Sequence, residues 1–252
     1  MPDADTPHPS SPDVAAIERV ISLIDLTDLD DSHRPDVIDG LLADARRHHT
    51  AAVCLWPEFI RRAADELAGS GVRVATVVNF PSGAASVADV VSEVDAALAD
   101  GAAEIDVVLP WRAFLDGDVE RARAMVDAVA SRVHDTPAAL LKVILETGEL
   151  PDVASVLAAT RLAIDGGADF VKTSTGKTAA GATPDAVAAM LDVIAETGGR
   201  VGIKPSGGVR TVADALAYLG LADDRLGEGW ATPDTFRFGA SGLLGDAVAR
   251  LG

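Results

Sequence analysis

The sequence predicts an α/β fold, a (β/α)8 TIM barrel built as a single domain with an extra N-terminal helix. Eight short, nearly continuous apolar segments alternate with longer, Ala-rich amphipathic segments. Continuous apolar strands separated by helices indicate parallel strands joined by right-handed crossovers. Eight such units in 252 residues fit a closed barrel. An open doubly wound sheet is the alternative, although no Gly-x-Gly-x-x-Gly motif follows the first strand, which argues against its dinucleotide-binding form.

Each element has its own local signal. The predicted strands are 21–27, 51–56, 72–80, 104–110, 139–147, 170–175, 201–208 and 235–241. The predicted helices are 34–47, 57–69, 86–100, 118–133, 151–166, 184–197, 211–220 and 242–250, with the extra helix at about 12–20 before the first strand. Pro57, Pro151 and Pro184 stand where a first-turn proline is tolerated, and Ser86 and Thr183 are suitable N-caps. Residues 1–12 are predicted to be a disordered lead-in to a barrel domain of residues 13–252.

Composition excludes several functions. The net charge of −18 repels nucleic acid and anionic membranes, and no apolar run reaches the length of about 18 residues that a membrane span needs. The single cysteine, Cys54, excludes an internal disulfide and is typical of the reducing cytoplasm. The five histidines do not cluster with cysteines or carboxylates at metal-ligand spacings, so we expect neither a metal nor a cofactor. The sequence leaves the oligomeric state open, and a homodimer is compatible with it.

Lysine usage gives the most specific chemical signal. The chain has four lysines against seventeen arginines, and Lys142, Lys172 and Lys204 lie inside apolar strand-like runs. Lysine can become a neutral amine nucleophile, whereas arginine stays charged. Because neighbouring parallel strands lie about 4.8 Å apart, Lys172 and Lys204 are predicted to be close enough to disfavour each other's ammonium form. A structural ion pair with a carboxylate is the alternative interpretation.

Other polar residues occur within or at the carboxyl ends of the strands, where barrel enzymes carry their active sites. They include Asp25, Thr27, Cys54, Asp106 and Thr175. A buried carboxylate such as Asp106 needs a partner, which the lysines can provide, and it could also move protons.

Three glycine-containing loops predict a phosphate site. Gly176-Lys177, Gly207-Gly208 and Gly239-Ala240-Ser241-Gly242 follow the sixth, seventh and eighth strands. Glycine lets backbone N–H groups approach an anion, and barrels often bind phosphate with the last two loops.

Together the segments LIDLTDL (23–29), AAVCLWPEFI (51–60), EIDVVLPWRA (104–113), ADFVKTSTGK (168–177), VGIKPSGGVR (201–210) and FRFGASGLL (236–244) resemble the deoxyribose-phosphate aldolase family of class I aldolases. The resemblance covers about residues 21–245. It implies reversible cleavage of 2-deoxy-D-ribose 5-phosphate to acetaldehyde and D-glyceraldehyde 3-phosphate through a lysine Schiff base. One departure is Gly242, where other members can have a second serine.

The resemblance also implies roles for individual residues. Lys172 corresponds to the Schiff-base lysine, Lys204 to its partner lysine and Asp106 to the proton-relay aspartate. Asp25, Thr27, Cys54, Lys142 and Thr175 are expected near the substrate; Gly176, Lys177, Gly207, Gly208, Gly239, Ser241 and Gly242 are expected at its phosphate. The alternatives are a Schiff-base aldolase for another phosphorylated sugar or keto acid, and a non-catalytic barrel that binds a phosphorylated ligand.

Overall fold

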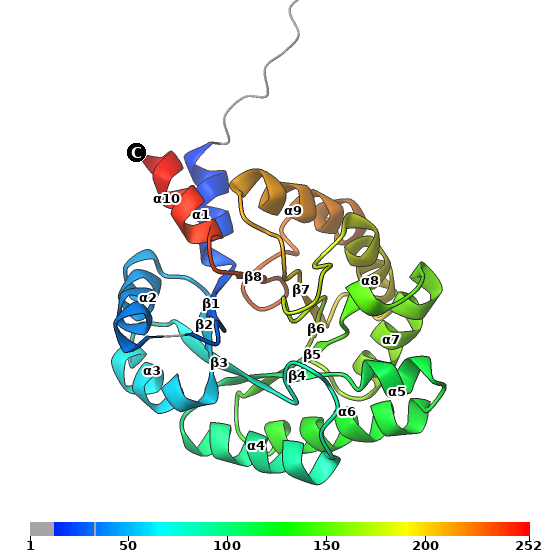
Figure 1. Cartoon of the computed structure of the whole chain (residues 1–252). Helices are drawn as coiled ribbons and strands as arrows, with labels where there is room; N and C mark the ends of the chain where they lie inside the picture. Colours follow the sequence, from blue (N-terminus) through cyan, green and yellow to red (C-terminus); the bar gives the residue numbers. More distant parts are fainter. Residues whose placement is uncertain (1–12, 33) are drawn as a thin grey trace, which may run out of the picture.

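The computed structural model describes residues 13–32 and 34–252, so the predicted lead-in of residues 1–12 lies outside the described part of the chain. Eight parallel strands form one sheet in the order β7-β6-β5-β4-β3-β2-β1-β8, surrounded by helices (Figure 1). The strands are β1 (Ile24–Asp28), β2 (Ala52–Leu55), β3 (Arg73–Val78), β4 (Glu104–Val108), β5 (Leu140–Ile144), β6 (Phe170–Lys172), β7 (Gly202–Lys204) and β8 (Phe238–Ala240).

The two edge strands of this sheet meet and close the barrel. Ile203 of β7 pairs with Phe236, and Ser206 pairs with Gly239 of β8. The Ile203 N–H donates to the Thr235 carbonyl at 2.9 Å, and the Arg237 N–H donates to the Ile203 carbonyl at 2.9 Å. The predicted eight-stranded parallel barrel is therefore confirmed, and the open doubly wound sheet is wrong.

Helices connect the strands and cover the outside of the barrel. They are α1 (Val14–Ser22), α2 (Pro35–His48), α3 (Ile60–Leu67), α4 (Val87–Ala99), α5 (Trp111–Leu115), α6 (Val119–His134), α7 (Val153–Asp165), α8 (Pro184–Glu196), α9 (Val212–Leu226) and α10 (Leu243–Leu251). Two 3-10 turns, η1 (Pro57–Phe59) and η2 (Thr147–Glu149), follow β2 and β5. The predicted extra helix is α1, which packs against α9 and α10 (Figure 1).

Four of the five predicted helix-start residues are confirmed and one is wrong. Pro57 and Pro184 are first-turn residues of η1 and α8. The Ser86 side chain accepts a hydrogen bond from the Asp89 N–H, and Thr183 accepts one from the Ala186 N–H. Pro151 is not a first-turn residue, because α7 begins two residues later. The side chain of Asp152, the true N-cap, accepts from Ser155 N–H and satisfies a donor that a proline-led start would leave free.

Some predicted boundaries also differ. The segment predicted as one helix over 57–69 divides into η1 and α3, and α9 continues to Leu226 instead of ending near residue 220. Gly220 lies within α9 and does not end it, since tertiary packing against α8 and α1 outweighs its low helix propensity. The short helix α5 was not predicted at all.

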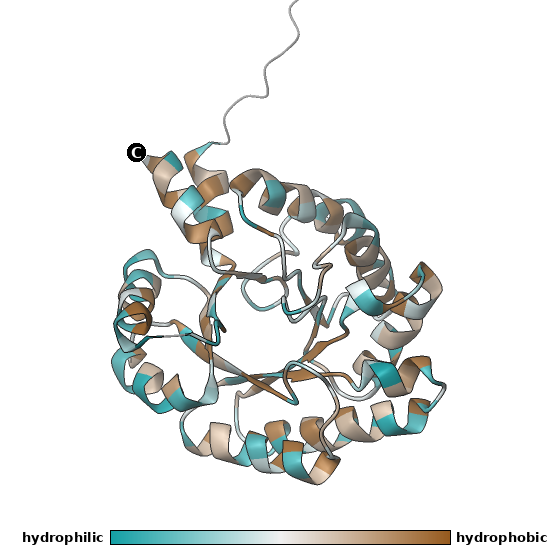
Figure 2. Cartoon of the chain, viewed as in Figure 1, coloured by the Kyte–Doolittle hydropathy of each residue, from teal (hydrophilic) through white to brown (hydrophobic). Residues whose placement is uncertain are grey.

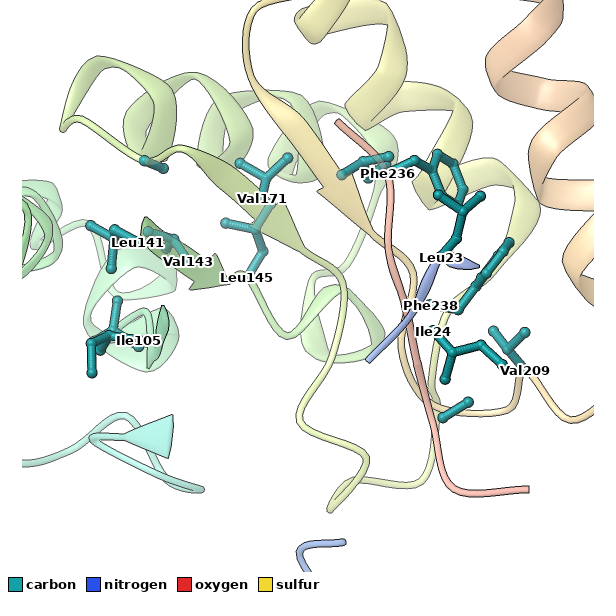
Figure 3. Packing of buried hydrophobic residues seen from close by; sticks show 14 of the residues in the cluster. Leu23, Ile24, Ile105, Leu141, Val143, Leu145, Val171, Val209, Phe236 and Phe238 are labelled. Carbon is teal, nitrogen blue, oxygen red and sulfur yellow. The ribbon is translucent and has the colours of Figure 1, made fainter. Parts of the chain in front are cut away.

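Strand alternation divides the residues of the barrel into two sets. Ile105, Leu141, Val143 and Val171 are fully buried members of the hydrophobic core (Figure 3). Successive strand residues point to opposite faces, so the charged residues between these positions point the other way, into the barrel. The strands are mostly hydrophobic in Figure 2, while the outer helix faces carry hydrophilic residues. The barrel interior therefore holds a set of buried charged residues that includes Asp106, Lys172 and Lys204.

Barrel closure next to β7 depends on Gly202. A Cβ atom at this position would lie 2.4 Å from the Phe170 ring of β6. We expect Gly202→Ala to lower the free energy of unfolding by about 1–3 kcal/mol, because the fully buried ring has no room to move. Chemical denaturation measures the change. Gly220→Ala in α9 is the matched control, since a Cβ there meets nothing within 4 Å and the change should be neutral or slightly stabilising. Equal effects of the two substitutions would contradict this account.

Candidate active site

A cavity of about 1150 Å³ opens among the loops that follow β1, β6, β7 and β8, at the carboxyl ends of the strands. Ten predicted site residues line it: Thr27, Lys172, Thr175, Gly176, Lys177, Gly207, Gly208, Gly239, Ser241 and Gly242. These residues come from four segments far apart in the sequence, and barrel closure brings them together.

Asp106 on β4 is the centre of the buried polar cluster beneath this cavity. Its Oδ2 atom accepts hydrogen bonds from Lys172 Nζ and Lys204 Nζ, each at 2.8 Å. Its Oδ1 atom accepts from Lys142 Nζ at 2.9 Å. Lys172 and Lys204 are also direct partners in the β6–β7 register. The predicted juxtaposition of these two lysines is therefore confirmed.

Two further carboxylates and an arginine complete the cluster. Asp25 on β1 lies 2.6 Å from Lys204 Nζ and accepts from Arg237 Nη1 at 2.6 Å. Glu104 on β4 accepts from Lys142 and, at 3.0 Å, from Arg237 Nη2. Each of these groups is almost completely buried, and burying charge is stable only with partners of this kind.

Electrostatics within the cluster favour the ionised forms of the carboxyls. Burial alone would raise the pKa of Asp106, but Lys142, Lys172 and Lys204 outweigh it and hold that pKa well below its usual range. Burial likewise opposes ionisation of Asp25, yet Lys204 and Arg237 lower its pKa. Asp106 is therefore a carboxylate that only accepts hydrogen bonds.

The sequence predicted that Lys172 and Lys204 would each disfavour the ammonium form of the other. For Lys204 this prediction is wrong. Burial would lower the pKa of Lys204, but Asp106 and Asp25 outweigh burial and raise the pKa well above its usual value. The sequence-based prediction considered only the neighbouring lysine and not the two carboxylates on β4 and β1. Lys204 is thus a fixed cation beside Lys172.

Among the three buried lysines, Lys172 alone lines the cavity. Lys142, Asp25 and Cys54 are each fully buried and do not line it, although the sequence placed them near the substrate. The Cys54 thiol lies 4.0 Å from Asp106 Oδ2, and burial raises the pKa of the thiol. These three residues contact one another or the amines and carboxylates of Lys204 and Asp106 beneath the cavity.

Close backbone packing shapes the cavity wall at the loops after β7 and β8. A Cβ on Gly239 would lie 2.1 Å from Ser206 Oγ and 3.1 Å from Lys204 Cε, so only glycine fits there. Gly207 has a φ of +81°, which glycine adopts without strain. Lys177 Nζ lies 3.0 Å from Asp31 Oδ1, across the cavity mouth between the loops after β6 and β1.

Sequence reasoning missed several residues of this region. Glu104 and Arg237 escaped notice because an isolated Glu or Arg in a strand carries no signal of its depth. Glu146, which is fully buried, accepts from Thr175 Oγ1 at 2.6 Å and from Thr175 N–H at 3.2 Å, so it holds the loop after β6. Arg210 lines the cavity and was noted only as part of the glycine loop.

Within residues 13–32 and 34–252, no group of three or more His, Cys, Asp or Glu side chains is arranged to hold a metal ion. A helix long and apolar enough to cross a membrane is also missing from the described residues.

Comparison with known proteins assigns the chain to a family. The model of the DeoC/LacD family aldolases matches residues 20–241. The chain belongs to this family. It is 48% identical over 236 residues to the deoxyribose-phosphate aldolase of Agrobacterium fabrum, a match that covers 92% of this chain and 90% of that protein.

Solved structures agree with this assignment. A crystal structure from Coccidioides immitis is 31% identical and has a TM-score of 0.81, covering 94% of this chain and 87% of that one. The deoxyribose phosphate aldolase of Aeropyrum pernix, described as a tetramer, is 26% identical with a TM-score of 0.78, and the match covers 93% of this chain and 92% of that one. The aldolase barrel is thus shared across most of each chain.

The buried carboxylates predict how stability depends on pH. The pKa values of Asp25, Glu104 and Asp106 are all lowered in the folded protein, because the surrounding cations outweigh burial. In the unfolded chain these groups take up protons near pH ~4. The stabilisation is therefore present above about pH 4 and is lost as the pH falls toward the folded values. Denaturant unfolding between about pH 6 and pH 3 should show a decreasing free energy of unfolding. A shallower slope is expected for Asp106→Asn, and a flat wild-type profile would refute the assignment.

Proposed function

We propose that this protein reversibly cleaves 2-deoxy-D-ribose 5-phosphate to acetaldehyde and D-glyceraldehyde 3-phosphate, with Lys172 as the Schiff-base nucleophile. One observation supports this choice of lysine most strongly. Three lysine amines surround Asp106, yet Lys172 is the one that also lines the cavity. The match to the aldolase family and the relative from Agrobacterium fabrum supply the reaction and the substrate.

The reaction begins at the amine of Lys172. The neutral amine attacks the C1 aldehyde of the open-chain sugar, and the carbinolamine loses water to give a protonated imine. Lys204 and Asp106 lie on the same side of this centre, within 2.8 Å of each other, so a cation and a carboxylate are both within reach of the transferred protons. The fixed charge of Lys204 lies beside this nucleophile, because the two lysines are partners in the β6–β7 register.

Carbon–carbon cleavage follows from the imine, which accepts electrons. Removal of the proton from the C3 hydroxyl breaks the C2–C3 bond, releases D-glyceraldehyde 3-phosphate and leaves an enamine on Lys172. The carboxylate of Asp106, kept ionised by the lysines around it, is the base available in the cluster, acting through water because Asp106 itself is fully buried. Protonation of the enamine at C2 and hydrolysis of the imine release acetaldehyde and restore the amine.

The sugar phosphate is placed at the loops after β6, β7 and β8. Gly207, Gly208 and Gly239 to Gly242 line that end of the cavity, and Gly242 is the N-cap of α10. Backbone N–H groups and a helix N-terminus favour an anion. Lys177 adds a cation there, and Thr27 and Thr175 lie on the cavity wall where sugar hydroxyls would be. The single cysteine supports a reducing compartment such as the cytoplasm, and the tetramer of the Aeropyrum pernix relative supports a homo-oligomer.

Replacement of Lys172 tests the nucleophile. We expect Lys172→Arg to abolish turnover because arginine keeps the charge but cannot form an imine. In the wild-type protein, borohydride reduction with acetaldehyde should attach an ethyl group to Lys172, located by peptide mass spectrometry. An active protein whose Lys172 stays unmodified would refute the assignment. Absence of any trapped adduct would instead favour a non-catalytic phosphate-binding barrel, and a panel of sugar phosphates and keto acids would detect a different donor.

Replacement of Asp31 tests where the phosphate of the substrate binds. Its carboxylate contacts Lys177, so it competes with a substrate phosphate for that amine. We expect Asp31→Asn to lower KM for 2-deoxy-D-ribose 5-phosphate by up to about fivefold, the range of an exposed ion pair. Lys177→Gln should raise it. The kcat/KM for unphosphorylated 2-deoxyribose is the internal control and should not change in either variant. Equal effects on both substrates would place the phosphate elsewhere.

A further inference from the structure

Two charged residues inside the barrel have no part in the proposed chemistry. Glu104 is fully buried, Arg237 has 1% of its surface exposed, and neither lines the cavity. A substrate therefore does not touch them. Burying two charged side chains in a barrel interior is costly, so the question is what they do for the residues that face the substrate.

Arg237 connects two of the three carboxylates in the cluster. Its Nη1 donates to Asp25 Oδ1 at 2.6 Å and to Glu104 Oε2 at 3.3 Å, and its Nη2 donates to Glu104 Oε1 at 3.0 Å. Its Nε donates to the Pro233 carbonyl. An arginine does not lose its proton in a protein, so this guanidinium is a permanent positive charge.

Two chains of ion pairs run from Arg237 to Asp106. One passes through Glu104 and Lys142, whose amine contacts both Glu104 and Asp106. The other passes through Asp25 and Lys204, whose amine contacts both Asp25 and Asp106. Each chain alternates in sign from Arg237 to the Asp106 carboxylate. Lys172 joins the cluster only at that carboxylate, through a single oxygen that it shares with Lys204.

The charges of these two chains balance without Lys172. The carboxylates are Asp25, Glu104 and Asp106, and the cations are Lys142, Lys204 and Arg237. Three negative charges therefore already face three positive charges. An ammonium group on Lys172 would add a fourth positive charge, and the carboxylate that it contacts, Asp106, is already shared with Lys142 and Lys204.

Other titratable groups near Lys172 do not alter this balance. Burial raises the pKa of Cys54 on β2, so its thiol is neutral. Arg73 on β3 reaches Glu104 with Nε at 2.6 Å from the edge of the network, and because 31% of its side chain is exposed, solvent weakens its charge more than those of the fully buried cations. Glu146 after β5 accepts hydrogen bonds from Thr175 and Thr178, and it makes no ion pair with any residue of the described chain.

We propose that Arg237 and Glu104 are positioning residues that set the charge balance around Lys172. Arg237 engages the carboxylates of Asp25 and Glu104, and so leaves the nucleophile only the Asp106 carboxylate, which it shares with Lys142 and Lys204. This inference rests on the proposed function, because it concerns the amine that forms the imine.

Removing the charge of Arg237 or that of Glu104 changes the charge balance of the cluster in a predictable direction. When the charge of Arg237 is removed, the carboxylates of Asp25 and Glu104 attract the amines of Lys204 and Lys142 more strongly. The Asp106 carboxylate is then free to pair with an ammonium group on Lys172. Without the charge of Glu104, the cluster has a positive excess, and the ammonium form of Lys172 becomes less favourable. The two substitutions therefore act with opposite sign, whereas loss of packing would impair both variants in the same way.

The experiment measures how the formation of the imine depends on pH. Each full-length protein is incubated with acetaldehyde and cyanoborohydride over a pH series, and the rate of ethylation at Lys172 is followed by mass spectrometry. We expect Arg237→Gln to move the pH of half-maximal rate upward by about one unit, and Glu104→Gln to move it downward by a similar amount. The double variant E104Q/R237Q restores the charge balance, so its midpoint should return toward that of the wild type. Arg237→Lys keeps the charge and should shift the midpoint least of the single variants at this position.

Arg73→Gln is the matched control from the exposed end of the network. It removes a positive charge that touches the same carboxylate, so the midpoint should rise by only a few tenths of a unit because solvent screens this position. If neither buried variant folds, Arg73→Gln still tests whether the charge of the cluster changes the pH midpoint of imine formation. Arg73 is partly exposed, so its replacement leaves the barrel interior intact. In that case an unchanged midpoint for Arg73→Gln would overturn the proposal.

Two other outcomes separate failure of this inference from failure of the proposed function. Midpoints that stay at the wild-type value in Arg237→Gln and Glu104→Gln, or that move in the same direction, would overturn the inference while leaving the proposed function in place. A wild-type protein that is never ethylated at Lys172 would instead refute the proposed function itself.

Discussion

One carboxylate surrounded by three lysine amines is the constraint on which the rest of this structure depends. Asp106 accepts hydrogen bonds from Lys142 through one oxygen and from Lys172 and Lys204 through the other. A buried carboxylate is stable only with such donors, and three buried amines are stable only if further carboxylates offset them. Asp25 and Glu104 supply those charges, and Arg237 balances them in turn. Among the almost fully buried groups, three carboxylates therefore already face three cations before the amine of Lys172 is counted.

The barrel places this network by simple geometry. Parallel strands in register put Lys172 beside Lys204, and the two-residue alternation turns hydrophobic neighbours such as Val171 and Ile203 toward the helices. Closure between β7 and β8 brings Arg237 across to the carboxylates of β1 and β4. Loops rich in glycine line the same cavity as Lys172. The proposed substrate, with an aldehyde and a phosphate, would use both parts of this lining.

The choice between lysine and arginine follows the same logic. Arg237 and Arg73 occupy positions where a permanent charge is needed, and neither faces the cavity. In the proposed reaction, Lys172 is the residue whose proton has to leave and return. The raised pKa of Lys204 shows that a lysine can also be held charged when two carboxylates outweigh its burial. Residue type alone does not separate these roles, since Lys142, Lys172 and Lys204 look alike in the sequence. Depth within the barrel separates them, because one amine of the three reaches the cavity.

The sequence by itself determined the eight alternating units, the barrel, the pairing of Lys172 with Lys204 and the three glycine loops, because these depend on local periodicity and strand order. It also carried the resemblance that the family comparison bears out. It misplaced the start of α7 and the end of α9, where a cap and tertiary packing outweigh local propensity. Only the tertiary structure decided that Asp25, Cys54 and Lys142 lie behind the site and that Glu104 and Arg237 belong to it. The reason is physical: whether a strand residue meets a ligand, a counter-charge or a helix depends on strand register and closure, which join segments more than a hundred residues apart.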